Sequence, residues 1–156
     1  MIINDVVILV GGKGSRLKKL TKYKAKPLIK INNTPFLDYL ISKLIKFDFK
    51  NIYLMCSYRK NSFFKIYNNK KLNNTKIICI NEKKPKGTAG ALYKLRKKIK
   101  NPFFLLNGDT FFDIDFNILI KNYNKNKIGI IALTNVKNSV NNKLMINLDL
   151  DHNGNI

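Results

Sequence analysis

The sequence predicts an α/β fold in which a mostly parallel central sheet is covered on both faces by helices. Short apolar runs rich in β-branched residues, each of strand length, alternate with segments whose apolar residues recur at helical spacing. The first of these runs, at residues 5–10, leads directly into a glycine-rich segment, where open α/β sheets bind their ligands.

The predicted elements follow this alternation along the chain. Residues 5–10 (DVVILV) read as a strand buried on both faces because the run is continuously apolar. A helix is expected over 36–45, with Thr34 as its N-cap, Pro35 at the first helical position and Asp38 in the first turn. The remaining expected strands are 51–57, 76–81, 103–107, 127–136 and 144–150, and the remaining helices are 59–68, 116–123 and 88–99 with Thr88 as its cap.

Length and composition fit one soluble domain, with 156 residues of which 45% are hydrophobic and 25% charged. The apolar runs are too short to cross a bilayer, and Asp5 interrupts the N-terminal run that a signal peptide would need. Cys56 and Cys79 lie in apolar runs without metal-ligand spacing, which favours buried free thiols in a reducing compartment. We therefore expect a cytoplasmic protein with no membrane partner.

The net charge of +21 raises the question of a nucleic-acid partner. The excess comes from 27 Lys against only 3 Arg, and Lys, Asn and Ile together make up 71 of the 156 residues. All three are encoded largely by codons of A and T, so base composition alone explains the charge. Since readers of nucleic acid favour Arg for bidentate base contacts, we do not expect such a partner.

Residues 11–16 (GGKGSR), directly after the first strand, are the first candidate for ligand binding. Three glycines let the backbone point several N–H groups at phosphate oxygens, and Arg16 adds a cation that can hold a phosphate bidentately. The segment is not a P-loop, because Gly14 follows Lys13, and not a dinucleotide fingerprint, because Leu17 replaces the third small residue. A plain strand-to-helix turn is the alternative interpretation.

Three further residues carry candidate chemistry. Lys26 precedes Pro27, which holds the lysine backbone extended; a solvated surface lysine is the alternative. Glu82 follows the strand 76–81, and its carboxylate could accept from two adjacent donors such as the N1 and N2 edge of guanine; a surface glutamate neutralised by neighbouring lysines is the alternative. Asp109 follows another strand and suits Mg²⁺ held against phosphate oxygens.

Taken together, these motifs resemble the N-terminal signature of the sugar-phosphate nucleotidyltransferases, the pyrophosphorylases that make nucleoside-diphosphate sugars. The resemblance rests on 9–17 (LVGGKGSRL), 26–28 (KPL), Glu82 followed by 87–91 (GTAGA), and 106–115 (LNGDTFFDID), which occur in the family's order. The last run looks most like the heptose 1-phosphate guanylyltransferases.

The resemblance implies a Rossmann-like (GT-A-like) three-layer fold and a defined reaction. The phosphate of a sugar 1-phosphate, of heptose or mannose type, attacks the α-phosphorus of a nucleoside triphosphate, with GTP favoured, and pyrophosphate leaves. The implied cofactor is Mg²⁺, and the implied partners are the two substrates; the chain could also form a homo-oligomer. The products would serve lipopolysaccharide or capsule biosynthesis. The implied catalytic residues are Arg16, Lys26 and Asp109, with Asp109 also the metal ligand, and the implied nucleotide-binding residues are Gly11, Gly12, Gly14, Ser15, Glu82, Gly87 and Thr88.

The sequence also departs from the family pattern. Ser15 replaces the usual Thr, Ala25 stands where a Pro commonly precedes the Lys, and Lys86 occupies a position that is usually apolar. The family pattern continues beyond residue 156 into a part that supplies sugar contacts and a second metal-binding aspartate. We therefore expect residues 1–156 to form a single C-terminally truncated nucleotidyltransferase domain, with the nucleotide-binding half present and the sugar-binding half absent. A non-catalytic nucleotide-binding remnant is the alternative.

Overall fold

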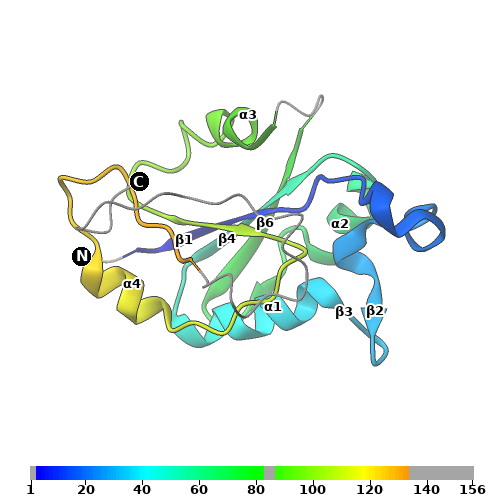
Figure 1. Ribbon diagram of the computed structural model, residues 1–156, viewed down its shortest axis with the longest axis horizontal. Coiled ribbons are helices and arrows are strands. Elements are labelled where there is room, and N and C mark those ends of the chain that lie inside the picture. Colours follow the sequence, from blue (N-terminus) through cyan, green and yellow to red (C-terminus); the bar gives the residue numbers. More distant parts are fainter. Residues whose placement is uncertain (1–2, 83–86, 134–156) are drawn as a thin grey trace. The chain divides into compact units, whose positions relative to one another are not determined.

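The computed structural model describes residues 3–82 and 87–133, drawn as the coloured ribbon in Figure 1. The chain divides into two units, residues 1–116 and 117–156, and each is described by itself.

A five-stranded sheet with the order β5-β6-β4-β1-β7 forms the centre of the first unit. Its strands β6, β4, β1 and β7 run parallel, as predicted, and the short edge strand β5 pairs antiparallel with β6. The chain builds outward from β1 to β6 and then returns to add β7 on the other side of β1, which places the topological switch point at β1. The strands are β1 (Asp5–Leu9), β4 (Asn51–Cys56), β5 (Lys71–Leu72), β6 (Thr75–Asn81) and β7 (Phe104–Asn107).

Helices cover both faces of this sheet, as the sequence predicts (Figure 1). Val6 and Ile8 of β1 face α1 and α2, whereas Val7 faces α3 and the turns that follow it. Since successive strand residues point to opposite faces, an unbroken apolar run is what a strand covered twice requires, and all three side chains are 0% exposed. The helices are α1 (Phe36–Leu44), α2 (Lys60–Tyr67) and α3 (Gly87–Tyr93).

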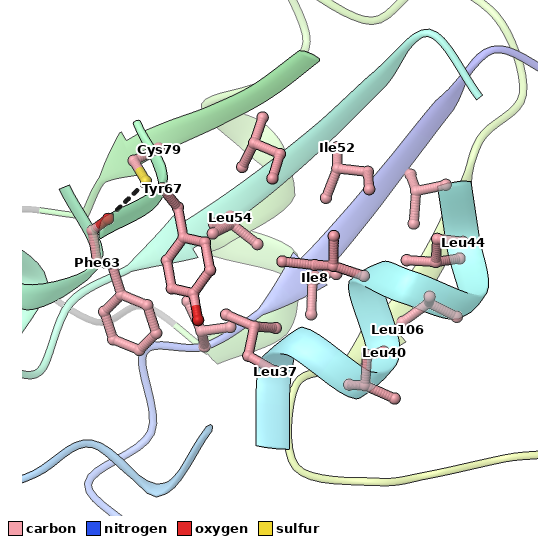
Figure 2. Close-up of a cluster of buried hydrophobic side chains, with 14 of the residues drawn as sticks. Ile8, Leu37, Leu40, Leu44, Ile52, Leu54, Phe63, Tyr67, Cys79 and Leu106 are labelled. Carbon is pink, nitrogen blue, oxygen red and sulfur yellow. Dashed lines mark hydrogen bonds between the residues drawn. The ribbon is translucent and has the colours of Figure 1, made fainter. Parts of the chain in front are cut away.

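The larger core lies between the sheet and helices α1 and α2. Figure 2 shows Leu37, Leu40 and Leu44 of α1 in one cluster of buried side chains with Ile8 of the sheet. One polar contact crosses this layer, because the Tyr67 hydroxyl of α2 donates a 2.6 Å hydrogen bond to the carboxylate of Asp38 in α1. Burial and this carboxylate raise the pKa of Tyr67, so its hydroxyl keeps the proton that holds the helices together.

Five phenylalanines extend this core beyond α1. Phe116 is 0% exposed and makes edge-to-face contacts with Phe47, Phe49, Phe104 and Phe112 at centroid distances of 4.8–5.9 Å. Such pairs each contribute about 0.5–1.5 kcal/mol beyond the area that they bury. The cluster therefore fixes the end of the first unit against β7.

Short elements connect the strands to the helices. A hairpin of β2 (Lys30–Ile31) and β3 (Thr34–Pro35) is joined by Asn32 and Asn33, whose φ values of 47° and 63° fit the two-residue turn that hairpins favour. Three 3-10 segments complete the unit: η1 (Ser15–Thr21), η2 (Lys26–Leu28) and η3 (Ile45–Phe47).

The predictions of helix caps were wrong at two places. Thr34 belongs to β3, and Pro35 rather than Thr34 is the N-cap of α1, because the Asn32 and Asn33 turn draws both residues into the hairpin. Thr88 lies within α3, which begins one residue earlier and ends at Tyr93, so the predicted helix 88–99 continues only as turns.

In the second unit, the helix predicted over 116–123 is confirmed as α4 (Phe116–Asn122), whose first residue belongs to the first unit. Residues 127–133 form no strand, although a strand was expected over 127–136. An apolar run becomes a strand only when another strand pairs with it, and none of the described strands pairs with this one. Residues 134–136 and the strand expected at 144–150 lie outside the described residues. No described helix has the length and apolar character needed to span a membrane.

Candidate functional site

The predicted site residues gather where the parallel strands end, because hydrogen bonds between strands continue into the loops. The amide of Val10 donates to the Met55 carbonyl at 3.1 Å, that of Gly108 to Leu9 at 3.0 Å, and that of Glu82 to Cys56 at 2.8 Å. The loops after β1, β4, β6 and β7 therefore start side by side at the carboxyl edge of the sheet.

Gly11 and Glu82 come together at this edge. A Cβ placed on Gly11 would lie 3.0 Å from Glu82 Oε2 and 3.0 Å from the Cβ of Ser57, so the position has no room for a larger residue. Glu82 is only 8% exposed, and burial raises the pKa of its carboxyl group, an effect that Lys94 partly opposes. A poorly solvated carboxylate at a ligand edge is suited to accept hydrogen bonds from a ligand.

A second group forms around Gly14, which adopts φ +61°, a conformation that glycine reaches without strain. Its carbonyl accepts a 3.0 Å hydrogen bond from the hydroxyl of Thr21, and a Cβ there would lie 3.1 Å from the Cβ of Lys26. Lys26 in turn pairs with Asp109, with 2.8 Å between Nζ and Oδ2. The structure thus joins two of the three predicted catalytic residues, and the sequence did not predict that they would touch.

Gly108 is what allows Asp109 to reach this position. A Cβ on Gly108 would lie 2.6 Å from Val10 Cγ1 and 3.0 Å from the Leu9 carbonyl oxygen, so the chain leaving β7 passes directly against the end of β1. Both members of the Lys26–Asp109 pair remain partly exposed, at 38% and 41% of their side chains. Pairs of this kind contribute about 0–1 kcal/mol, so the pair adds little to stability.

The other predicted residues line the same edge without joining these two groups. Gly12 is open, with no atom within 4 Å of a Cβ placed on it, and Gly87 begins α3 with φ +69°. Ser15, Arg16 and Thr88 are exposed, and among the described residues none of them makes a side-chain hydrogen bond or an ion pair. The Arg16 guanidinium is therefore available to an anion.

The donor chemistry around Asp109 fits a hard cation shared with a phosphate group. Oδ2 is paired with Lys26, while the one hydrogen bond of Oδ1 to a described side chain comes from the Thr110 hydroxyl at 3.4 Å. Within residues 3–82 and 87–133, no three His, Cys, Asp or Glu side chains cluster in a way that could hold a metal by themselves. Mg²⁺ is commonly held by one or two carboxylates together with substrate phosphates, which a single aspartate can satisfy.

Sequence reasoning missed Tyr58 and Arg59, which are separated from the end of β4 only by Ser57. The Tyr58 hydroxyl donates to the carbonyl of Thr21 at 3.0 Å, and Arg59 Nη2 donates to that of Lys22 at 2.9 Å. The positional rule that identified Glu82 and Asp109, namely that residues just past a parallel strand face the ligand edge, applies equally to these two.

The chemistry of this edge agrees with a family match. The sequence matches the Nucleotidyl transferase family over residues 5–143. The chain belongs to the nucleotidyl transferase family. The glycine loop after β1 and the acidic residue after β7 are thus placed on the fold that their resemblance to this family implied.

The chain is also similar to two named relatives and to a solved structure. The chain is 42% identical over 121 residues to D-glycero-alpha-D-manno-heptose 1-phosphate guanylyltransferase of Campylobacter jejuni, covering 78% of the chain and 54% of that relative. It is 34% identical over 136 residues to the mannose-1-phosphate guanylyltransferase catalytic subunit beta of Xenopus tropicalis, covering 84% of the chain and 38% of that relative. The crystal structure of HddC from Yersinia pseudotuberculosis complexed with GMP-PN matches with a TM-score of 0.63 and 35% identity. The match covers 76% of the chain and 53% of HddC.

These matches confirm the Rossmann-like fold with its mostly parallel sheet. The chain spans about half the length of the heptose relative and of HddC, and less of the mannose relative.

The burial of Glu82 predicts a pH-dependent stability. Because folding raises the pKa of Glu82, the folded state holds the carboxyl proton more tightly than the unfolded chain does. Ionisation of Glu82 therefore lowers the free energy of unfolding as pH rises above the pKa of Glu in the unfolded chain, about 4.3. Glu82→Gln should be more stable than the wild-type chain at pH 7, and this advantage should vanish below about pH 4. Urea unfolding across this pH range measures the difference.

Asp113→Asn provides a control of opposite sign. Its exposed carboxylate bonds to Lys43, which lowers the pKa of Asp113 in the folded state. The ionised Asp113 therefore stabilises the fold at pH values above its unfolded pKa, and this stabilisation is lost as pH falls through its folded pKa. This variant should lose a little stability at pH 7 and none at low pH. A Glu82→Gln advantage that is equal at all pH values would contradict the assignment to ionisation.

Proposed function

We propose that the chain carries the nucleotide site of a sugar-phosphate nucleotidyltransferase, which transfers a nucleotidyl group from a nucleoside triphosphate to a sugar 1-phosphate. The observation that carries the proposal is the arrangement at one sheet edge. A glycine loop lies between a buried carboxylate at Glu82 and the Lys26–Asp109 pair. The two groups offer one place for a base and one for charged phosphates.

The phosphate side follows from charge and exposure. Gly12 supplies open backbone for the phosphates, and Gly14 sets the turn of the loop beside Lys26. Arg16 is free to hold the departing pyrophosphate, and Lys26 neutralises charge on the α-phosphate or sugar phosphate. Mg²⁺ bound at Asp109 would supply further neutralisation of the phosphate oxygens.

The reaction is a single displacement. A phosphate oxygen of the sugar 1-phosphate forms a bond to the α-phosphorus, the bond from that phosphorus to the bridging oxygen breaks, and pyrophosphate leaves with the electron pair. Because no covalent enzyme intermediate is needed, the protein contributes alignment and charge stabilisation.

We further propose GTP as the triphosphate and a heptose or mannose 1-phosphate as the acceptor. Guanine presents adjacent donors at N1 and N2, and a carboxylate can accept from both. The names of the two relatives, both guanylyltransferases, support this choice, as does the GMP-PN complex of HddC. A non-catalytic, nucleotide-binding role is the second candidate, because the residues assigned above hold the nucleotide and, apart from Lys26, none of them is assigned to the sugar 1-phosphate.

Base choice is tested with GTP and ITP, which lacks the N2 amino group. The wild-type chain should bind GTP about tenfold or more tightly than ITP, since a buried acceptor left without its donor is costly. In Glu82→Gln the two nucleotides should bind almost equally, because the amide oxygen accepts only one good bond there. Calorimetry in the presence of Mg²⁺ measures both affinities, and an unchanged GTP preference in the variant would remove Glu82 from base recognition.

Two glycine variants test where the nucleotide lies. Gly12→Ala meets no atom of the described structure, so its melting temperature should stay unchanged while GTP affinity falls about tenfold or more if the nucleotide fills the open space. Gly14→Ala should lose both stability and affinity, because alanine at φ +61° is strained by about 1 kcal/mol and its Cβ meets Thr21 and Lys26. Full GTP affinity in Gly12→Ala would contradict a nucleotide on this loop.

Turnover is tested by pyrophosphate exchange between labelled pyrophosphate and the nucleoside-diphosphate sugar. Arg16→Ala and Asp109→Asn should each reduce exchange by about 100-fold or more, the usual loss when one charge-stabilising group is removed. The matched controls are Arg96→Ala, whose guanidinium lies 3.7 Å from the ring of Tyr93, and Asp113→Asn. GTP binding without any exchange by the wild-type chain would favour the non-catalytic candidate.

A further inference from the structure

The 3-10 segment η1, which follows the glycine loop, has almost no apolar packing to hold it. Every residue of η1 is exposed except Thr21, and its two leucines, Leu17 and Leu20, are 37% and 61% exposed. A hollow of about 410 Å³ lies beside the segment, lined by residues of η1, by the flanking Lys13 and Lys22, and by Tyr58. The position of the segment therefore depends on specific polar contacts.

Those contacts come from Tyr58 and Arg59, at the end of β4. The Tyr58 hydroxyl donates to the Thr21 carbonyl at 3.0 Å, and Arg59 Nη2 donates to the Lys22 carbonyl at 2.9 Å. The Tyr58 amide also donates to the carbonyl of Gly11 at 3.3 Å. Two consecutive residues thus hold both the beginning and the end of the loop that runs from Gly11 to Lys22.

A chain of contacts links this anchor to the charged side of the site. The Thr21 hydroxyl donates to the Gly14 carbonyl at 3.0 Å, and Gly14 lies against the Cβ of Lys26, which pairs with Asp109. Thr21 is 4% exposed, so its hydroxyl has this internal partner in place of water. Movement at Thr21 would therefore displace the residues proposed to contact phosphates.

The backbone of Arg59 adopts a strained conformation that supports its contact with the Lys22 carbonyl. Its φ of 54° and ψ of 31° lie in the left-handed region, which disfavours residues with a Cβ. Such strain persists where the surroundings require it and is common at functional sites. Here it places a guanidinium, 5.5 Å from the ring of Tyr58, within reach of the Lys22 carbonyl.

We propose that Tyr58 and Arg59 are positioning residues of the nucleotide site, which hold residues 11–22 in the conformation that receives the phosphates. They act through the loop backbone and do not themselves contact the nucleotide. The role rests on the proposed function. A loop already held in place loses less freedom on binding, and a loop that samples other conformations binds with an affinity reduced by the fraction that is competent.

The variants separate the two side chains and include matched controls. Tyr58→Phe removes only the hydroxyl, and Arg59→Gly removes the guanidinium while relieving the backbone strain. Arg59→Lys keeps a cationic donor and should partly restore the wild-type behaviour. Tyr39→Phe breaks the same kind of bond, from Tyr39 to the Ile31 carbonyl at 2.9 Å, and Arg96→Ala breaks the bond to the Tyr93 carbonyl at 2.9 Å.

Hydrogen exchange without nucleotide measures the loop directly. The amide of Leu17, bonded to the Gly14 carbonyl at 3.0 Å, reports on η1, and that of Val10, bonded to Met55 at 3.1 Å, reports on the sheet. In Tyr58→Phe and Arg59→Gly, exchange at Leu17 should rise about three- to tenfold, the factor that one hydrogen bond typically gives, and exchange at Val10 should stay unchanged. The two control variants should change neither amide.

Calorimetry with Mg-GTP on the same proteins completes the test. The dissociation constant should rise about three- to tenfold in both loop variants and should stay at the wild-type value in the controls. If the wild-type chain binds GTP, unchanged exchange at Leu17 or unchanged affinity in the loop variants overturns the positioning role alone. If the wild-type chain does not bind GTP, the proposed function itself fails, and the positioning role with it.

Discussion

The placement of β1 between β4 and β7 is the constraint on which the rest of the structure depends. Leu9, its last residue, is in register with both Met55 of β4 and Asn107 of β7, so the loops on either side start at the same level. The buried side chains on both faces of β1 fix this register, because a slip by one residue would exchange the faces of every side chain. The glycine loop, the turn at Tyr58 and the acidic residue Asp109 are neighbours for this reason.

Two features of the site do not add to the stability of the folded chain. Burial of the Glu82 carboxylate disfavours its charged form, and the half-exposed pair of Lys26 and Asp109 contributes little energy. Gly11 and Gly108 likewise sacrifice side-chain packing for close approach of backbone and neighbouring residues. Local departures of this kind, gathered at one edge of an otherwise well-packed fold, are typical of a functional site.

The sequence predicted what depends on local pattern and failed where distant partners decide. β1, β4 and β6 could be recognised because each is an apolar run of strand length, and the carboxyl-edge rule then found Glu82 and Asp109. The same rule points to Tyr58, which stands in the same relation to β4. The contact of Lys26 with Asp109, 83 residues apart, has no local signal, and Thr34 was misassigned because two asparagines in left-handed conformations formed a hairpin in front of α1.

The late pairing of β1 with β7 also shapes how the protein is made. Val6 pairs with Ile52 on one side and with Phe104 on the other, so one edge of β1 stays open while the intervening chain is synthesised. At about 5–20 residues per second, the synthesis of the chain from Val6 to Phe104 takes about 5–20 s. During this time the nascent chain presents an apolar strand with unpaired backbone groups, which is a template for wrong pairing. The glycine at position 108, which lets β7 dock closely on β1, therefore also serves the step that ends this exposure on the ribosome.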